Sequence, residues 1–226
     1  MRTIIIPAGG SAVRFGGTLK ELLPITAKGT PFLHALYNAR YRYYADTIIV
    51  ISNPKKIQEH SHYLAEHCEF AQDVQLRLTV DPTNVWKAIQ AVLPDEASGI
   101  CLADTITDAV TVQHTKDINF GIFKTHEPER FSIFDTNRII TKPQNYPAPA
   151  YAWGTVAWSQ EVSMYLKSQM FTHYDEAFNA VIQNFSYGVH ILPYYYDIGT
   201  FEAYRAFFQE RYGYGTSKSN RNTHEL

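Results

Sequence analysis

Glycine and basic side chains are concentrated in one segment near the N-terminus, from Pro7 to Pro24. The segment has glycines at positions 9, 10, 16 and 17, with Arg14 and Lys20 among them. A glycine-rich loop after a strand can bring backbone N–H groups close to phosphate oxygens, and the two cations add fixed positive charge there. The pattern suits a triphosphate site, and taken alone it fits a turn with two solvated cations equally well. It is neither a Walker A motif nor G-x-G-x-x-G.

Two aspartates stand where an α/β protein can place ligand-binding acids. Asp104 follows the apolar run Ile100–Ala103, and the carboxyl end of a buried strand is where open α/β sheets bind ligands. Asp197 begins the stretch Asp-Ile-Gly-Thr, in which Thr200 suits the N-cap of a following helix. Each aspartate also has a structural alternative, as part of a turn or of a helix N-terminus.

A third charged segment reads as short strands and turns. It runs Pro128-Glu129-Arg130-Phe131, then Phe134-Asp135, and then Thr141-Lys142-Pro143. Tyr151-Ala152-Trp153-Gly154 follows it. On its own the segment fits a surface hairpin with solvated charges as well as it fits a binding site.

Taken in order, these segments resemble the sugar-1-phosphate nucleotidyltransferases, of the glucose-1-phosphate thymidylyltransferase type. Gly9, Gly10 and Arg14 match the family's G-G-x-G-T-R, and the residues from Lys20 to Pro24 match its K-x-L-L-P. The later matches are Leu102-Ala103-Asp104 to L-G-D, Pro128–Pro143 to P-E-R-Y-G … F-D … E-K-P, and Asp197–Tyr204 to D-x-G-T-x-x-x-Y. The resemblance extends from Thr3 to Phe207.

The resemblance implies an enzyme that transfers a nucleoside monophosphate from an NTP to a sugar 1-phosphate, or to a similar phosphorylated small molecule, and releases pyrophosphate. The implied catalytic residues are Arg14, Lys20, Asp104 and Asp197, with Mg²⁺ held by Asp104 and Asp197. The implied nucleotide-binding residues are Ala8, Gly9, Gly10, Ser11, Arg14, Lys20 and Asp81. The implied acceptor-binding residues are Thr141, Lys142 and Gly154.

Several departures from the family pattern leave other functions open. Ala12, Val13 and Ala103 replace two glycines and a threonine, and they favour a catalytically inactive nucleotide-sugar-binding subunit. Thr141 replaces a glutamate that holds sugar hydroxyls, and it favours a cytidylyltransferase for a polyol or choline phosphate. A glycosyltransferase would require an Asp-x-Asp metal motif, whereas this chain has Asp104-Thr105-Ile106.

Asp81 is a candidate for reading the base. An ionised carboxylate only accepts hydrogen bonds, so it suits the adjacent donors of guanine and repels the carbonyl oxygens of uracil and thymine. If Asp81 faces the base, GTP is preferred over UTP and dTTP. The alternative is a loop turn at Asp81-Pro82.

The composition of the chain is that of a globular protein and gives no indication of a nucleic-acid-binding or membrane-spanning protein. The 226 residues are 45% hydrophobic with a formal net charge of −2, so the chain has a globular composition and no global attraction to nucleic acid or anionic membranes. No run approaches the ~20 apolar residues of a membrane span. Two cysteines, Cys68 and Cys101, favour a reducing compartment, and we expect a cytoplasmic protein. A homo-oligomer is possible.

The elements that position these residues alternate between strand and helix. We expect strands at Thr3–Ile6, Thr47–Ser52, Leu76–Val80, Gly99–Ala103, Ala150–Trp158 and Tyr187–Leu192. We expect helices at Thr30–Tyr43, Pro54–His67, Val85–Leu93, Gln160–Gln169, Tyr174–Asn184 and Thr200–Tyr212. The alternation predicts an α/β chain with a mostly parallel central sheet and helices on both faces, in the Rossmann-like GT-A nucleotidyltransferase fold of the resemblance. Residues 1–212 form one predicted domain and residues 213–226 a disordered tail.

Overall fold

The computed structural model describes residues 2–10, 19–27, 29–79, 81, 83–108 and 116–213. Ser11, Arg14 and the predicted tail from residue 214 onward lie outside the described residues. The strands are β1 (Arg2–Pro7), β2 (Thr47–Ser52), β3 (Val74–Leu78), β4 (Ala97–Ile100), β5 (Thr105–Thr107), β6 (Ile118–Thr125), β7 (Ser132–Asp135), β8 (Arg138–Thr141), β9 (Ala150–Trp158), β10 (Tyr187–Ile191) and β11 (Tyr195–Asp197). The helices are α1 (Pro31–Tyr37), α2 (Ile57–His67), α3 (Val85–Gln90), α4 (Gln160–Ser168), α5 (Tyr174–Asn184) and α6 (Phe201–Tyr212). Short helical turns are η2 (Lys20–Leu22), η3 (Asn38–Arg42), η4 (Ala71–Asp73) and η5 (Pro128–Arg130).

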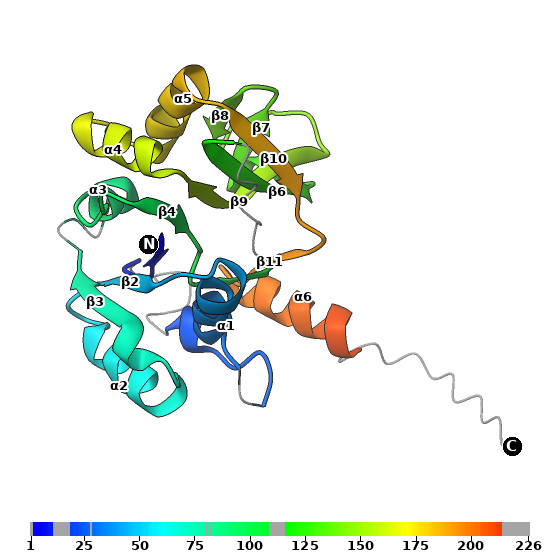
Figure 1. The fold of residues 1–226 in the computed structure, drawn as a ribbon. Helices are drawn as coiled ribbons and strands as arrows, with labels where there is room; N and C mark the ends of the chain where they lie inside the picture. Colours follow the sequence, from blue (N-terminus) through cyan, green and yellow to red (C-terminus); the bar gives the residue numbers. More distant parts are fainter. Residues whose placement is uncertain are drawn as a thin grey trace, which may run out of the picture.

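One mixed sheet of nine strands runs through the part of the chain that the structure describes. Its main order is β10-β6-β9-β4-β1-β2-β3, with β7 and β8 added at β9. The pairs β1–β2, β1–β4, β2–β3 and β6–β10 are parallel, whereas β9 is antiparallel to both β4 and β6. Helices cover both faces (Figure 1), so the predicted fold class is confirmed.

Alternation along β1 divides the core between these two faces. Ile4 and Ile6 pack with Phe32 and Leu36 of α1 and Leu64 of α2. Ile5, between them, packs on the opposite face with side chains of α3, α4 and α5. Successive strand residues point to opposite faces, so the isoleucine run of β1 anchors both helical layers.

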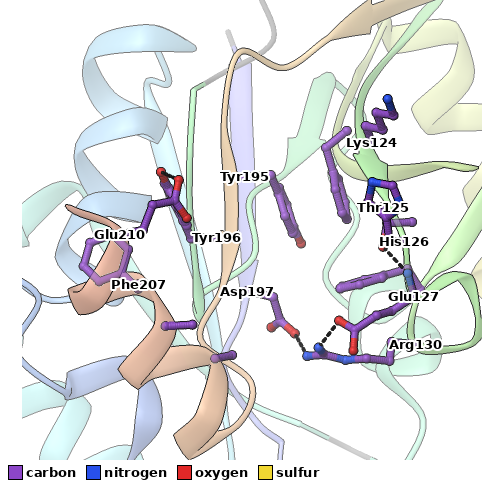
Figure 2. Close-up of a pocket in the computed structure, with 14 residues that line it drawn as sticks. Lys124, Thr125, His126, Glu127, Arg130, Tyr195, Tyr196, Asp197, Phe207 and Glu210 are labelled. Atoms are coloured by element: carbon purple, nitrogen blue, oxygen red, sulfur yellow. Dashed lines mark hydrogen bonds and ion pairs between the residues drawn. The ribbon is translucent and has the colours of Figure 1, made fainter. Parts of the chain in front are cut away.

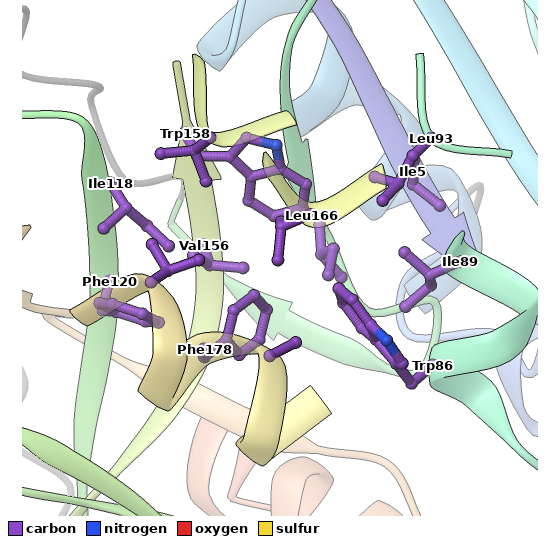
Figure 3. Close-up of a cluster of buried hydrophobic side chains, with 14 of the residues drawn as sticks. Ile5, Trp86, Ile89, Leu93, Ile118, Phe120, Val156, Trp158, Leu166 and Phe178 are labelled. Carbon is purple, nitrogen blue, oxygen red and sulfur yellow. The ribbon is translucent and has the colours of Figure 1, made fainter. Parts of the chain in front are cut away.

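Phe178 of α5 lies at the centre of the larger layer. Its ring centroid is 5.8 Å from that of Trp86 and 5.6 Å from that of Phe120, and its side chain is fully buried. Figure 3 shows Phe178 between Phe120 and Trp86, with Trp158 of β9 close by. Aromatic side chains from α3, β6 and β9 therefore meet on one helix.

Several predicted boundaries differ from the structure. The strand predicted at Gly99–Ala103 ends at Ile100, so Asp104 lies in a turn before β5 rather than at the strand end. The helix predicted from Pro54 begins at Ile57, after a turn. The short strands β5 and β11 were not expected, because three residues carry no recognisable alternation.

Phe178→Ala tests this core. The change removes contacts to at least two buried aromatic rings and should lower the free energy of unfolding by ~3–5 kcal/mol. Urea denaturation monitored by tryptophan fluorescence measures it. Met170→Ala, at a side chain that is 99% exposed, is the matched control and should change that free energy little. Equal effects of the two substitutions would contradict the assignment of the core.

Candidate active site

A small second sheet brings the two candidate aspartates together. β5 pairs antiparallel with β11, with Thr105 opposite Asp197. The backbone N–H of Ile198 donates to the carbonyl of Asp104 at 2.8 Å. Residues that are far apart in the sequence therefore become backbone neighbours, and both carboxylates belong to one site.

A cation binds each carboxylate. The Lys20 ammonium forms an ion pair with Asp104. Arg130 donates from Nη2 to Oδ2 of Asp197 at 2.8 Å, and from Nη1 to Oε2 of Glu127 at 2.6 Å. Figure 2 shows Arg130 reaching from the η5 turn towards Asp197. The four charges thus come from four separate segments of the chain.

Burial and like charge act on the aspartates. Burial and the nearby Asp104 raise the pKa of Asp197, and Arg130 and Lys20 offset that shift only in part. Burial lowers the pKa of Lys20, but the charge and hydrogen bond of Asp104 and the charge of Asp197 outweigh it and raise the pKa overall. Lys20 is therefore a fixed positive charge, and the pair of carboxylates attracts further cations.

The pair suits a cation that keeps few protein ligands. The side chains of Asp104 and Asp197 remain 25% and 22% exposed, which leaves oxygen atoms accessible. Within the described residues no cluster of three or more His, Cys, Asp and Glu side chains could hold a metal. Mg²⁺ typically binds one or two carboxylates and completes its shell with water and phosphate oxygens, so these two aspartates fit it.

A small cavity, which we call the glycine-loop cavity, lies at the C-terminal end of β1. Its volume is about 170 Å³, and its lining includes Gly9, Gly10, Thr79, Asp81 and Leu102. Three of the candidate nucleotide-binding residues therefore line one cavity. The Asp81 carboxylate also has a local role, because Oδ1 accepts from the backbone N–H of Thr83 at 2.9 Å and from its hydroxyl at 2.6 Å.

A larger cavity, which we call the Arg130 cavity, has Asp197 in its lining. It measures about 450 Å³ and is lined by Arg130, Asp197, Phe123, Phe131 and Tyr195 among others. The rings of Phe123 and Tyr195 stack in parallel with centroids 3.7 Å apart. Figure 2 shows the Tyr195 ring in the cavity. The cavity therefore has an aromatic wall and one guanidinium.

Gly154 supports this wall from β9. A Cβ atom at this position would lie 2.4 Å from Cε2 of Tyr195, closer than real contacts allow. Only glycine lets the Tyr195 ring lie against the strand. The acceptor-binding role predicted for Gly154 remains a prediction, and its position behind Tyr195 makes any such role indirect.

Thr141 and Lys142 end the β7–β8 hairpin, and both are exposed. The backbone N–H of Lys142 donates to the carbonyl of Phe131 at 3.0 Å, which puts it near the segment that carries Arg130. Lys142 has a φ of 42°, an uncommon conformation for a residue with a Cβ atom. Among the described residues, its side chain makes no hydrogen bond or ion pair with either aspartate, so its role remains a prediction.

Arg130 belongs to the Pro-Glu-Arg-Phe motif, but the motif alone does not place it at the site. Only the fold shows that η5 directs the guanidinium to Asp197. The sequence also does not predict Tyr195 as a site residue, because it stands in the run Tyr194-Tyr195-Tyr196. Only the alternation of side chains along β11 determines which of these rings lies in the cavity.

Comparisons with known proteins agree with the fold. No family model matches the chain, and no curated protein matches it. Three solved structures are similar: a Bacillus anthracis protein assigned as a glucose-1-phosphate thymidylyltransferase, HddC from Yersinia pseudotuberculosis, and UDP-glucose pyrophosphorylase from Acinetobacter baumannii. Their TM-scores are 0.77, 0.67 and 0.68, at 18%, 16% and 12% identity. The matches cover 92%, 93% and 93% of this chain and 94%, 99% and 93% of those chains. The expected nucleotidyltransferase fold is therefore confirmed.

Asp197→Asn tests the electrostatics of the aspartate pair in metal-free protein. Because the folded-state pKa of Asp197 lies above its ordinary value of 3.8, the folded protein binds the proton more tightly than the unfolded chain does. Wild-type stability should fall as the pH rises from that value through the raised pKa, and the asparagine variant should lack this loss. The difference in Tm should therefore shift in favour of the variant between acidic and neutral pH.

The matched control is Asp95→Asn, at a carboxylate that is 77% exposed on the surface. Its difference in Tm from the wild type should vary less with pH. A deficit for Asp197→Asn that grows as the pH rises would mean that the lost contact to Arg130 outweighs burial and the repulsion from Asp104, and a constant deficit would mean that folding does not shift this pKa.

Proposed function

We propose that this protein is a Mg²⁺-dependent nucleotidyltransferase, which joins a nucleoside monophosphate from an NTP to a sugar 1-phosphate and releases pyrophosphate. The observation that carries the proposal is the pair Asp104 and Asp197, each in an ion pair with a cation, with Asp197 lining the Arg130 cavity. The fold shared with nucleotidyltransferase structures supports the same reaction class.

The glycine-loop cavity is the proposed nucleotide side. Gly9 and Gly10 follow β1, and Lys20 comes from the same segment of the chain. Backbone N–H groups and one ammonium can neutralise a triphosphate there. Ser11 and Arg14, which belong to the same proposed set, lie outside the described residues.

The Arg130 cavity is the proposed acceptor side. The planar guanidinium of Arg130 carries several N–H donors, which suits a phosphate monoester. The backbone of Lys142 is hydrogen-bonded to Phe131, the residue after Arg130. Asp197 lines the Arg130 cavity, and Asp104 follows two residues after Leu102, which lines the glycine-loop cavity. In the proposed reaction an acceptor phosphate and an NTP therefore approach each other at the aspartate pair.

The proposed chemistry is an in-line attack by an acceptor phosphate oxygen on the α-phosphorus, with pyrophosphate leaving. A phosphate monoester is already ionised near neutral pH, so the reaction requires no general base. Lys20 and Arg130 hold the two anions close together and stabilise the charge of the transition state. Mg²⁺ on Asp104 and Asp197 would supply further charge neutralisation to the phosphate oxygens.

A cytoplasmic location completes the proposal. Cys68 and Cys101 are both buried as free thiols, as is usual for proteins of a reducing compartment. Among the described residues no helix is long and apolar enough to cross a membrane.

Pyrophosphate release tests the function directly. The protein should release pyrophosphate from an NTP only when a phosphorylated acceptor is present, and EDTA should abolish the release until Mg²⁺ is added. A panel of four NTPs, dTTP, sugar 1-phosphates and the phosphates of choline and polyols gives the specificity. A preference for CTP with choline or polyol phosphate would favour that alternative, and binding without release would favour an inactive subunit.

Arg130→Ala tests the acceptor side. Because Arg130 is proposed to bind the acceptor phosphate with charge-assisted hydrogen bonds, kcat/KM for the acceptor should fall by roughly ten- to a hundredfold. Arg138→Ala is the matched control, because Arg138 also pairs with a carboxylate three positions earlier but is 64% exposed on the hairpin. Steady-state kinetics at varied acceptor concentration measure kcat/KM for both variants. Equally small decreases in kcat/KM for Arg130→Ala and Arg138→Ala would show that Arg130 does not bind the acceptor.

A further inference from the structure

Three ionisable side chains are buried behind the glycine loop, outside the residues proposed to touch substrate. We call Glu21, Lys56, His60 and the neighbouring Ser52 the Lys56 cluster. The side chains of Lys56, Glu21 and His60 are only 6%, 2% and 0% exposed. Such groups are rarely buried, because removing charge from water costs free energy that one ion pair does not always restore.

Hydrogen bonds connect every member of the cluster. Lys56 Nζ donates to Oε1 of Glu21 at 2.7 Å, and Nε2 of His60 lies 3.1 Å from the same oxygen. Nδ1 of His60 lies 2.8 Å from the Ser52 hydroxyl oxygen. Burial raises the pKa of Glu21, but the contacts from His60 and Lys56 outweigh it and hold that pKa below its ordinary value. Glu21 is therefore an ionised acceptor for both partners.

Lys56 also contacts the glycine loop. Its Nζ donates to the carbonyl of Ala8 at 3.4 Å, and the side chain of neighbouring Asn53 donates to the carbonyl of Gly9 at 2.8 Å. Glu21 directly follows Lys20 in the η2 turn. One ammonium therefore joins the start of the glycine loop to the turn that carries Lys20.

These contacts orient the loop amides. In a trans peptide the C=O and N–H groups point in opposite directions. Since the carbonyls of Ala8 and Gly9 point to Lys56 and Asn53, the N–H groups of Gly9 and Gly10 point away from that side. Those two N–H groups are the ones that a phosphate would use, and their direction is set before any ligand binds.

We propose that Lys56 is a positioning residue that, with Glu21 and Asn53, holds the glycine loop and Lys20 in a fixed arrangement for the phosphates of the NTP. The proposal rests on the proposed nucleotidyltransferase function. It predicts an effect on the NTP side of the reaction that is separate from the acceptor side, because no member of the Lys56 cluster lines the Arg130 cavity.

Lys56→Met keeps the length of the side chain and removes its charge. The KM for the NTP, and for pyrophosphate in the reverse reaction, should rise by roughly tenfold or more, because small displacements of phosphate-binding groups have large effects. The KM for the acceptor should change by less than about twofold if the acceptor site stays intact. Asn53→Ala removes the bond to Gly9 without a charge change, and it carries the same test if Lys56→Met does not fold.

Ser52→Ala is the matched control within the cluster. It removes the partner of His60 but no contact to the Ala8 or Gly9 carbonyl, so it should lower Tm and leave both KM values unchanged. A similar rise in both KM values for Lys56→Met, or the same NTP effect for Ser52→Ala, would overturn the positioning role.

Amide hydrogen exchange gives a second readout that requires no activity. The N–H groups of Leu22 and Leu23 close the η2 turn on the carbonyls of Leu19 and Lys20 at 2.9 and 3.2 Å. In ligand-free Lys56→Met their exchange should be faster than in the wild type, whereas Ser52→Ala should leave it unchanged. Unchanged exchange in Lys56→Met would refute the coupling. If the wild type transfers no nucleotide, the proposed function fails and the exchange result still decides the coupling.

Discussion

Two carboxylates are held side by side by the pairing of β5 with β11 and by the bond from Ile198 to the Asp104 carbonyl. Two like charges in a partly buried place repel each other, and the raised pKa of Asp197 reflects its burial together with that repulsion. Two basic side chains compensate this negative charge. Lys20 approaches from the N-terminal segment and Arg130 from the η5 turn, and each neutralises one carboxylate.

A site built in this way gives up some stability for chemistry. Replacing one carboxylate by a neutral group would relieve the repulsion, so the aspartate pair is not what holds the fold together. Stability comes instead from the layers around β1 and from the aromatic cluster at Phe178. These packed layers support β4, after which the chain turns at Asp104 and enters β5, and the two acids remain partly exposed.

Buried charges also lie behind the glycine loop. Lys56, Glu21 and His60 are buried at a cost in solvation that apolar side chains would avoid. Their contacts reach the carbonyls of Ala8 and Gly9 through Lys56 and Asn53, and so they orient backbone amides that lie outside the cluster. The glycine loop is therefore hydrogen-bonded to the turn that precedes α2.

The sequence by itself determined the fold class, most of the element order and the identity of the two acids. Apolar runs such as Thr47–Ser52 predict strands from the sequence alone, because the period of side chains along a strand is set by local backbone geometry. Tertiary structure alone decided that Asp104 leaves the sheet in a turn, that β5 and β11 pair, and that Arg130 reaches Asp197. Those contacts join segments that are far apart in the chain. A strand of three residues is also too short for its hydrophobic pattern to predict which strand it pairs with. The buried pairing of Lys56 with Glu21 belongs to the same class, because charged residues give no sign in sequence that they will be buried.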